Sequence, residues 1–219
     1  MGQTQSAEIA VDDINIFQRL AKNERPNRWK KEQVKFALTG RSATGKSTFL
    51  NTIRNVKPGE DGFAQPGSGK TTTAPTIYMH PTNDQITFYD LPGYATTIFK
   101  KEDYISQMKI SDYHFVFIFF NDVLGEDDTW LACELRKLGK PFALVRSKID
   151  VDIENAIYDG NDPEMIIAEI KGKIEKSLNT NTELNDTKRI FLISSRNPEL
   201  GEWSDLMTYV EDNIGWFKA

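Results

Sequence analysis

The feature that most constrains this chain is the segment GRSATGKS, residues 40–47, which directly follows a strand-like run. Its spacing of two glycines, a lysine and a serine is that of a phosphate-binding loop, in which glycines let successive backbone N–H groups turn toward an anion. Such a loop lies between a strand and the first turn of a helix. The sequence therefore predicts a strand at 33–39, a helix at 47–54 and a nucleotide-phosphate site between them.

Each residue of this loop has a role that follows from its position. Lys46 would reach the β- and γ-phosphates and stabilise the charge that develops there, and the Ser47 hydroxyl would bind Mg²⁺. The predicted nucleotide-binding residues of the loop are Gly40, Ser42, Ala43, Thr44, Gly45, Lys46, Ser47 and Thr48.

A second Gly-Lys-Thr tripeptide occurs in PGSGKTTTAP, residues 66–75. It is not a second phosphate loop, because the first glycine of the pattern would fall on Ala64, no strand precedes it, and Pro75 with its β-branched neighbours prevents a helix. Its threonines, 71–73, instead lie where a nucleotide switch senses the γ-phosphate and Mg²⁺. An ordinary surface loop explains this stretch equally well when it is taken alone.

Further along the chain, apolar strand-like runs alternate with helical patterns. The runs 75–80 and 85–90, separated by the turn PTND, predict a hairpin. Strands are also predicted at 113–120, 141–147 and 189–194, and helices at 129–138, 163–178 and 201–214. This alternation predicts an α/β fold, a mostly parallel central sheet with helices on both faces and ligands at the carboxyl ends of its strands.

The residues before the first strand form a segment of their own. Apolar side chains recur three or four residues apart over 7–20, which predicts an amphipathic helix that ends before Pro26. We therefore divide the chain into an N-terminal segment with this helix, 1–32, and one domain, 33–219.

Charge, hydropathy and cysteine content exclude several classes of protein. The net charge is −5 and basic residues are scattered, which argues against nucleic-acid binding. No apolar run approaches the roughly 20 residues of a membrane span, and the chain does not open with a secretory segment. The single cysteine, Cys133, rules out an internal disulfide and favours a cytoplasmic location.

The segment YDLPG, residues 89–93, ends the second strand of the predicted hairpin. Asp90 there can hold a Mg²⁺-bound water, and the Gly93 amide can approach the γ-phosphate because no side chain blocks it. Asp-x-Pro-Gly is also a common turn. Its place after a strand and downstream of a phosphate loop favours the phosphate-sensing role.

Two further segments at strand ends have the pattern of a guanine site: RSKID, residues 146–150, and ISSR, residues 193–196. Asp150 can accept hydrogen bonds from guanine N1–H and the exocyclic amine, while the Lys148 stem packs along the purine. Adenine lacks this pair of donors, so the aspartate selects guanine. The Ser195 amide can meet guanine O6. A solvated charge pair after a strand is the alternative, and spacing alone does not decide between them.

Together, GRSATGKS, YMHP leading into FYDLPG, SKID and FLISS…P make the chain resemble a Ras-type GTPase domain, and more closely the immunity-related (interferon-inducible) GTPases. The resemblance covers about 34–217. It implies a P-loop NTPase of the Ras-like GTPase fold that binds GTP or GDP with Mg²⁺ and hydrolyses GTP slowly. It also implies nucleotide-dependent homo- or hetero-dimers through G domains, peripheral association with internal (ER, Golgi or vacuolar) or pathogen-containing membranes, and a role in cell-autonomous immunity.

Aligned on YMHP, the resemblance makes Thr72 the switch threonine, although Thr71 and Thr73 are its neighbours. The predicted catalytic residues are then Lys46, Thr72 and Gly93, and the predicted metal ligands are Ser47, Thr72 and, through water, Asp90.

The chain departs from the family pattern at three places and from Ras-like enzymes at a fourth. Ser147 stands where the guanine motif has Asn or Thr, and its smaller hydroxyl is expected to loosen the base loop. Lys70 replaces an acid found two positions before the switch threonine in relatives, so no role of that acid is carried over. Tyr94 occupies the place of the glutamine that orients water in Ras-like enzymes. Relatives continue into a helical domain, whereas this sequence stops at Ala219, as a truncated chain or a minimal member of the family would.

These departures predict that the chain hydrolyses GTP slowly on its own, and that a second molecule supplies or orders the missing catalytic groups. A regulator that holds GTP or GDP without hydrolysis is the first alternative, and an ATPase or nucleoside kinase, disfavoured by SKID, is the second. The start MGQTQS fits myristoylation of Gly2, with Ser6 at the required place. One acyl chain gives marginal membrane binding, so a second anchor would be needed.

Overall fold

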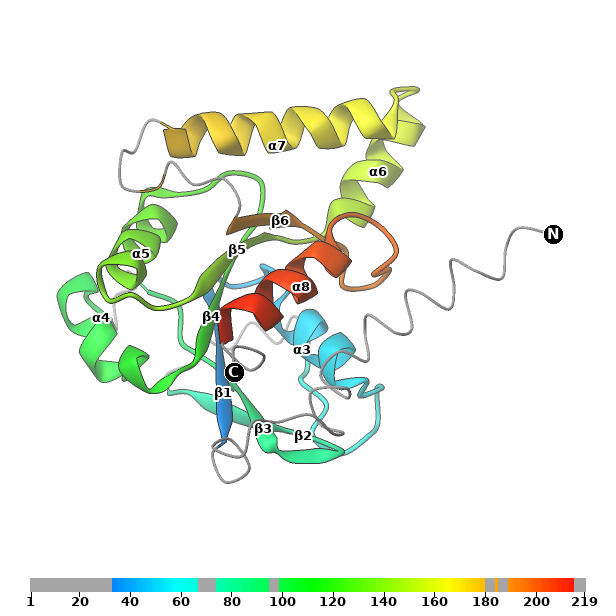
Figure 1. Cartoon of the computed structure of the whole chain (residues 1–219). Coiled ribbons are helices and arrows are strands. Elements are labelled where there is room, and N and C mark those ends of the chain that lie inside the picture. Colours follow the sequence, from blue (N-terminus) through cyan, green and yellow to red (C-terminus); the bar gives the residue numbers. More distant parts are fainter. Residues whose placement is uncertain (1–32, 67–73, 95–98, 180–183, 185–188, 215–219) are drawn as a thin grey trace.

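The computed structural model describes residues 33–66, 74–94, 99–179, 184 and 189–214 (Figure 1). Within these residues the strands form one six-stranded sheet in the order β2-β3-β1-β4-β5-β6. The strands are β1 (Val34–Gly40), β2 (Thr76–His80), β3 (Asn83–Asp90), β4 (Phe115–Phe120), β5 (Phe142–Arg146) and β6 (Ile190–Leu192). The helices are α3 (Lys46–Arg54), α4 (Lys101–Gln107), the 3-10 turn η2 (Ile110–Asp112), α5 (Glu126–Lys137), α6 (Ile149–Tyr158), α7 (Pro163–Asn179) and α8 (Trp203–Ile214).

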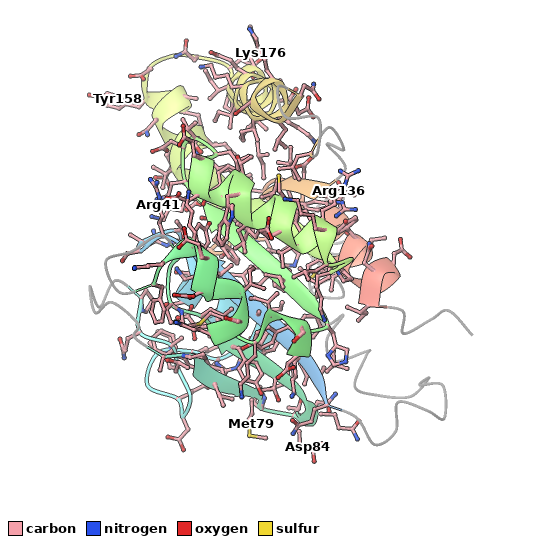
Figure 2. The ribbon with its side chains drawn as sticks, turned by 90° about the vertical axis from the view of Figure 1, so that its left-hand side faces the viewer. Arg41, Met79, Asp84, Arg136, Tyr158 and Lys176 are labelled. Atoms are coloured by element: carbon pink, nitrogen blue, oxygen red, sulfur yellow. The ribbon has the colours of Figure 1, made fainter. Side chains whose placement is uncertain are left out.

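The sheet is parallel except at one edge. β1 pairs in parallel with β3 and β4, and β4, β5 and β6 follow in parallel, whereas β2 pairs antiparallel with β3. The carboxyl ends of five strands therefore lie at one edge of the sheet. Arg41, which follows β1, lies toward that edge, and Met79 and Asp84 lie at the opposite end (Figure 2). This confirms the predicted α/β fold with a mostly parallel central sheet.

The sheet is buried on both faces, as the continuous apolar run of β4 predicted. Neighbouring residues of that strand, such as Phe117 and Ile118, belong to two separate apolar clusters because side chains alternate across a strand. The first cluster joins the sheet to α3 and α8, and the second joins it to α4, α5 and α7 (Figure 1). Phe49 of α3 lies at the centre of the first, with ring centroids 5.2 Å from both Phe117 and Trp203.

Several predicted boundaries move for local reasons. The hairpin turns over two residues, 81–82, so β3 begins at Asn83 rather than at 85. α5 begins at Glu126, three residues before the predicted start, because Asp128 Oδ2 accepts a hydrogen bond from the Gly125 amide at 2.8 Å and caps the helix.

Two helices, α4 and α6, are absent from the sequence-based assignment, and α6 includes the end of the RSKID segment. The predicted helix at 7–20 lies outside the described residues, and the division into 1–32 and 33–219 stays a prediction. In the described part of the chain, none of the helices has the length and hydropathy of a membrane-spanning segment.

Candidate functional site

The phosphate-loop segment, residues 40–47, connects β1 to α3 along a path that its glycines permit. Gly40 has φ +135°, and a Cβ there would lie 2.1 Å from the carbonyl oxygen of Phe119 on β4. Gly45, the N-cap of α3, has φ +88°, and a Cβ there would lie 2.9 Å from Ser147 Oγ. Neither position admits a side chain without strain. The two glycines therefore fix the turn by which the chain leaves the sheet and enters the helix.

The first turn of α3 presents backbone N–H groups that the helix itself does not satisfy. The bond from Phe49 N to Gly45 O, 2.9 Å, begins the helical pattern, so the amides of Lys46, Ser47 and Thr48 precede it. Among the described residues no side chain caps this end, and the first turn contains no acid. The partial positive charge at a helix start suits a phosphate group.

The Lys46 side chain folds back over the loop. Its ammonium donates hydrogen bonds to the carbonyl oxygens of Gly40, 2.9 Å, and Arg41, 2.8 Å. Burial lowers the pKa of Lys46, and the nearby Asp90 carboxylate opposes that shift. A cation held by two loop carbonyls, with little water around it, can transfer its hydrogen bonds to phosphate oxygens at small cost.

Asp90 ends β3 and faces the same region. One carboxylate oxygen, Oδ1, is buried without a hydrogen-bond partner among the described residues. Burial raises the pKa of Asp90, and Lys46 partly offsets this. An orphaned carboxylate oxygen close to the phosphate loop fits a hydrated Mg²⁺. Among the described residues, no three His, Cys, Asp or Glu side chains form a cluster that could hold a metal ion.

The segment around Gly93 is held by two tyrosines, Tyr94 and Tyr104, of which the sequence analysis did not assign Tyr104. Tyr104 of α4 is fully buried, and its hydroxyl donates to Pro92 O at 2.7 Å and also lies 2.7 Å from Thr39 Oγ1. The Tyr94 hydroxyl donates to Asp128 Oδ1 on α5. Burial, and then the Asp128 charge, raise the pKa of Tyr94 well above its usual range. The Tyr94 hydroxyl is thus occupied by α5, in keeping with the expectation that it does not orient water.

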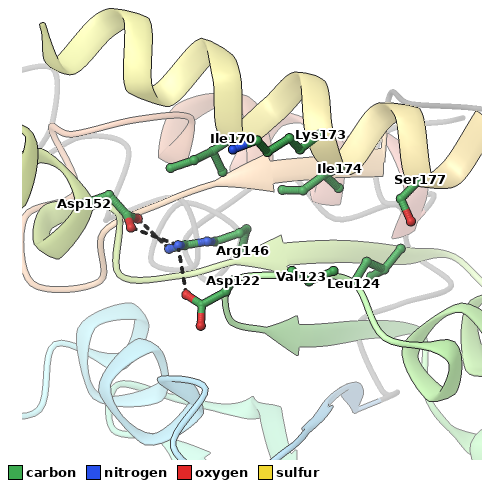
Figure 3. A pocket seen from close by; sticks show the side chains of 9 residues that line it. All are labelled: Asp122, Val123, Leu124, Arg146, Asp152, Ile170, Lys173, Ile174 and Ser177. Carbon is green, nitrogen blue, oxygen red and sulfur yellow. Dashed lines mark hydrogen bonds and ion pairs between the residues drawn. The ribbon is translucent and has the colours of Figure 1, made fainter. Parts of the chain in front are cut away.

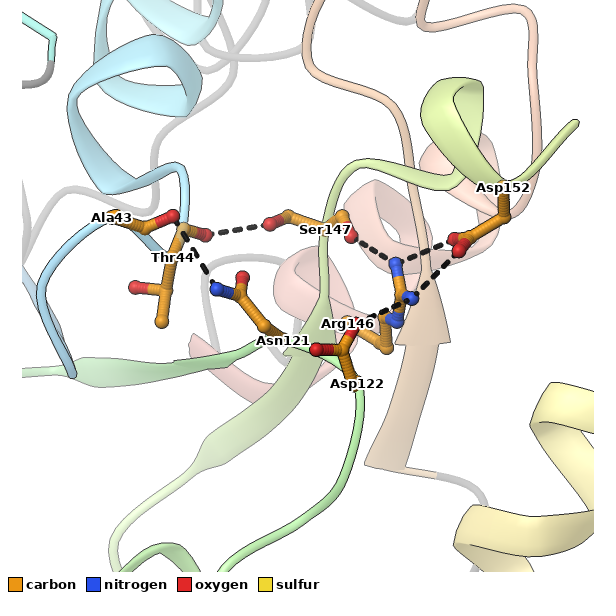
Figure 4. Close-up of polar contacts among 7 residues, drawn as sticks. All are labelled: Ala43, Thr44, Asn121, Asp122, Arg146, Ser147 and Asp152. Carbon is orange, nitrogen blue, oxygen red and sulfur yellow. Dashed lines mark hydrogen bonds and ion pairs between the residues drawn. The ribbon is translucent and has the colours of Figure 1, made fainter. Parts of the chain in front are cut away.

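The loop after β5 is tied directly to the phosphate loop (Figure 4). Ser147 Oγ donates a 2.6 Å hydrogen bond to Thr44 O, and both residues are buried. Asn121, which follows β4, adds a 3.5 Å contact from Nδ2 to Ala43 O. The Ser147 hydroxyl thus reaches the neighbouring loop, and the expectation that its smaller size loosens the base loop stays a prediction.

The predicted base-site residues follow β5 and β6 at the same edge of the sheet. Lys148 is exposed and has the left-handed φ of +65°, and Asp150 lies in the first turn of α6. Ser195 follows β6, and its carbonyl accepts a 2.6 Å hydrogen bond from Thr52 Oγ1 of α3. Ser195 Oγ is buried and has no partner within the described residues.

The structure thus brings the phosphate loop, Asp90, Gly93 and the loops after β5 and β6 to one edge of the sheet. Within the phosphate loop Ser42 and Ala43 are exposed, and Thr48 is half-buried. Thr72 and Gly2 lie outside the described residues. The roles assigned to all of these residues stay predictions.

One buried residue beside the site was missed. Arg146, the last residue of β5, is 3% exposed, and its guanidinium is paired with Asp152 of α6 at 2.7 Å. A signal was present, because RSKIDVD places an arginine between an apolar strand and two acids spaced two apart. A charged residue at that position is rarely buried without a partner.

Comparison with known proteins identifies relatives of this chain. A model of the interferon-inducible GTPase family (IIGP) matches residues 8–219. Interferon-gamma-inducible GTPase 10 of Mus musculus is 36% identical over 169 residues, 75% of this chain and 40% of that protein. T-cell-specific guanine nucleotide triphosphate-binding protein 2 of Mus musculus is 41% identical over 119 residues, 54% of this chain and 29% of that protein. The chain thus spans well under half the length of these relatives.

Solved structures show the same fold. Era from Aquifex aeolicus, bound to GDP and AlF4⁻, matches with a TM-score of 0.54 at 22% identity, over 83% of this chain and 57% of that chain. The bacterial dynamin GTPase LeoA matches with a TM-score of 0.52 at 17% identity, over 98% of this chain and 46% of that chain. At these identities the likeness concerns the fold.

Proposed function

The chain belongs to the interferon-inducible GTPase family, and on that premise we propose that it binds GTP and GDP with Mg²⁺ and hydrolyses GTP slowly. The observation that carries the proposal is the geometry of the phosphate loop. Two glycines at positive φ lead into a helix start without a side-chain cap among the described residues, and the Lys46 ammonium lies across the loop. This arrangement is suited to a polyphosphate.

Different residues of the chain are proposed to bind the phosphates and the Mg²⁺ ion. The loop amides and Lys46 hold the β- and γ-phosphates, and Lys46 stabilises the charge that grows on them as the terminal phosphate is cleaved. Ser47 and, through water, Asp90 would hold Mg²⁺, which neutralises phosphate charge when bound. Thr72 is proposed to sense the γ-phosphate beside the Gly93 amide.

Guanine recognition is proposed for the loops after β5 and β6. Asp150 would accept the N1–H and amine protons of guanine, the Lys148 stem would cover the ring, and the Ser195 amide would meet O6. The hydrogen bond from Ser147 to Thr44 supports this proposal, since it keeps the base loop at a fixed distance from the phosphate loop.

Slow turnover follows from the surroundings of Gly93. The residue after this glycine, Tyr94, donates its hydroxyl to Asp128 and does not point a free group at water. We propose that a second GTPase domain, in a nucleotide-dependent homo- or hetero-dimer, supplies or orders the missing group. We further propose that the protein is cytoplasmic, carries myristate on Gly2 and associates peripherally with internal or pathogen-containing membranes. There it would act in cell-autonomous immunity. The family membership and the MGQTQS start support it.

The proposal is tested by competition and turnover. GTP and GDP should displace a fluorescent GDP analogue in the presence of Mg²⁺, and ATP should not at 100-fold higher concentration (about 2.7 kcal/mol of selectivity). Phosphate release per molecule should rise with protein concentration. Tight binding with no phosphate release would favour a non-hydrolysing regulator, and a flat concentration dependence would argue against activation by dimerisation. Intact-mass analysis of protein from eukaryotic cells tests the lipid, since an unmodified Gly2 contradicts it.

A further inference from the structure

The buried guanidinium of Arg146 joins three segments at the edge of the candidate base site (Figure 3). Its Nη2 donates a 3.0 Å hydrogen bond to Asp152 Oδ1, and its Nη1 lies within ion-pair distance, 2.7 Å, of Asp152 Oδ2. Nη1 also donates to Ser147 O at 2.5 Å, and Nη2 lies 3.5 Å from Asp122 Oδ1. One side chain thus contacts the base loop, α6 and the turn after β4.

The pair of acids on α6 faces two directions. Residues two apart on an α-helix point about 200° apart, since each residue turns the helix by about 100°. Asp152 points from α6 toward Arg146 (Figure 4). Asp150 therefore projects from another side of α6, and the proposed function requires that side to face the base. The rotation of α6 about its axis decides whether Asp150 reaches that nucleotide.

Packing alone holds α6 weakly on the side of Arg146. Of the ten residues of this helix, Ile149 and Ala156 are buried. A cavity of about 290 Å³ lies between Arg146, Asp152 and the α7 residues Ile170 and Ile174 (Figure 3). Side chains do not fill this space, and the contacts of Asp152 with the Arg146 guanidinium join the helix to β5 there.

The backbone of Lys148, which links the base loop to α6, is strained. Lys148, the N-cap of α6, is in the left-handed region, which costs a residue with a Cβ about 1–2 kcal/mol. Its neighbours are held on both sides, because Ser147 O accepts from Arg146 and Ile149 N donates to Ile193 O at 3.3 Å. Strain of this kind persists where the surroundings determine the conformation, and often at binding sites.

We propose that Arg146 and Asp152 form a positioning pair that sets the guanine preference of this chain by holding Asp150 toward the base. The inference rests on the proposed function, since it assumes that a guanine nucleotide occupies the site. Neither residue of the pair touches the base. The pair acts through the rotation of α6 and the backbone of the base loop.

The test compares GDP with inosine diphosphate, which lacks the exocyclic amine that Asp150 would bind. The wild-type chain should prefer GDP by about 10- to 100-fold, the value of one hydrogen bond to a charged group. Arg146→Met should reduce that preference to less than about threefold, because GDP loses two hydrogen bonds to Asp150 whereas inosine diphosphate loses one. Asp152→Asn keeps the side-chain shape and should shift the preference in the same direction, so the test survives if Arg146→Met does not fold.

Two further variants separate positioning from stability. Arg146→Met combined with Asp152→Leu replaces the ion pair by apolar groups and should recover thermal stability without the guanine preference. Lys173→Gln, a control in the wall of the same cavity, should keep the wild-type preference. A preference unchanged in both single variants, with only the melting temperature lowered, would overturn the inference alone. A wild-type chain with no preference for GDP would overturn the proposed function as well.

Discussion

The hydroxyl of Ser147 donates a 2.6 Å hydrogen bond to the backbone carbonyl of Thr44, and this bond joins the loop after β5 to the phosphate loop. Both partners are buried, so the bond is shielded from competition by water. The distance between the predicted base and phosphate sites is therefore built into the fold.

Removing this bond should weaken nucleotide binding. Ser147→Ala leaves the Thr44 carbonyl without its donor, at a cost of about 1–3 kcal/mol. We expect GDP affinity, measured by calorimetry, to fall about 10-fold. Ser147→Thr, which keeps the hydroxyl, serves as the control and should stay within about threefold of wild type. Equal affinities for the alanine variant and wild type would show that the two loops are held together by other contacts.

The glycine that begins the phosphate loop should not tolerate a methyl group. In Gly40→Ala the new Cβ would lie 2.1 Å from Phe119 O, a backbone atom that cannot move aside cheaply. Gly139→Ala is the matched control, since Gly139 also has positive φ, +63°, but a Cβ there meets nothing within 4 Å. We expect the first variant to be less stable than the second by about 1–3 kcal/mol in urea unfolding. Similar stabilities would contradict the close approach of the loop to β4.

The bond from Tyr94 to Asp128 should contribute to stability rather than to chemistry. Tyr94→Phe keeps the ring and removes the donor to a buried carboxylate, which should lower the melting temperature by about 4–8 °C. Phosphate release per active site should stay within about twofold of wild type. Tyr158→Phe, at a tyrosine that is 91% exposed, should change neither quantity. A 10-fold loss of turnover in Tyr94→Phe would instead give its hydroxyl a part in hydrolysis.

His80 should make the fold sensitive to mild acid. Burial, and then the charge of Arg54, lower the pKa of His80 to about 4, and its neutral Nδ1 accepts a hydrogen bond from Thr82 N. The unfolded chain, with a histidine pKa near ~6.5, therefore binds more protons between the two values. Stability is full above about pH 6.5 and falls by roughly 3 kcal/mol as the pH drops to about 4.

The His80→Gln variant isolates this effect from the titration of carboxylates. Its free energy of unfolding, measured from pH 7 to pH 4, should fall less steeply than that of wild type. Two parallel curves would show that His80 does not carry the pH dependence.

The parts of the fold that the sequence predicted depend on short, local patterns. GRSATGKS encodes its own turn through Gly40 and Gly45, and FVFIFF encodes a strand buried on both faces through its unbroken apolar run. Helix α6 was not predicted because it buries few residues and because its N-cap, Lys148, has a left-handed conformation that favours glycine. Helix α4 is seven residues long with Tyr104 as its buried residue, too short for a periodic pattern.

The contacts that organise the site join residues that are far apart in the sequence. Tyr94 and Asp128 are 34 positions apart, and Ser147 and Thr44 are 103 positions apart. Propensity and spacing carry no information on which of these side chains meet. Motif position predicted which loops lie at the carboxyl edge of the sheet, but not that the Ser147 hydroxyl would bond to Thr44 O.

The most direct test of guanine binding by this chain is an exchange of base specificity at Asp150. Asp150→Asn offers one donor and one acceptor, which match the O2 and N1–H of xanthine but not the two donors of guanine. In calorimetric titrations the wild-type chain should bind GDP at least about 100-fold more tightly than xanthosine diphosphate, and Asp150→Asn should reverse that order. If the variant binds GDP as tightly as wild type and gains nothing for xanthosine diphosphate, Asp150 does not read the base and the account fails.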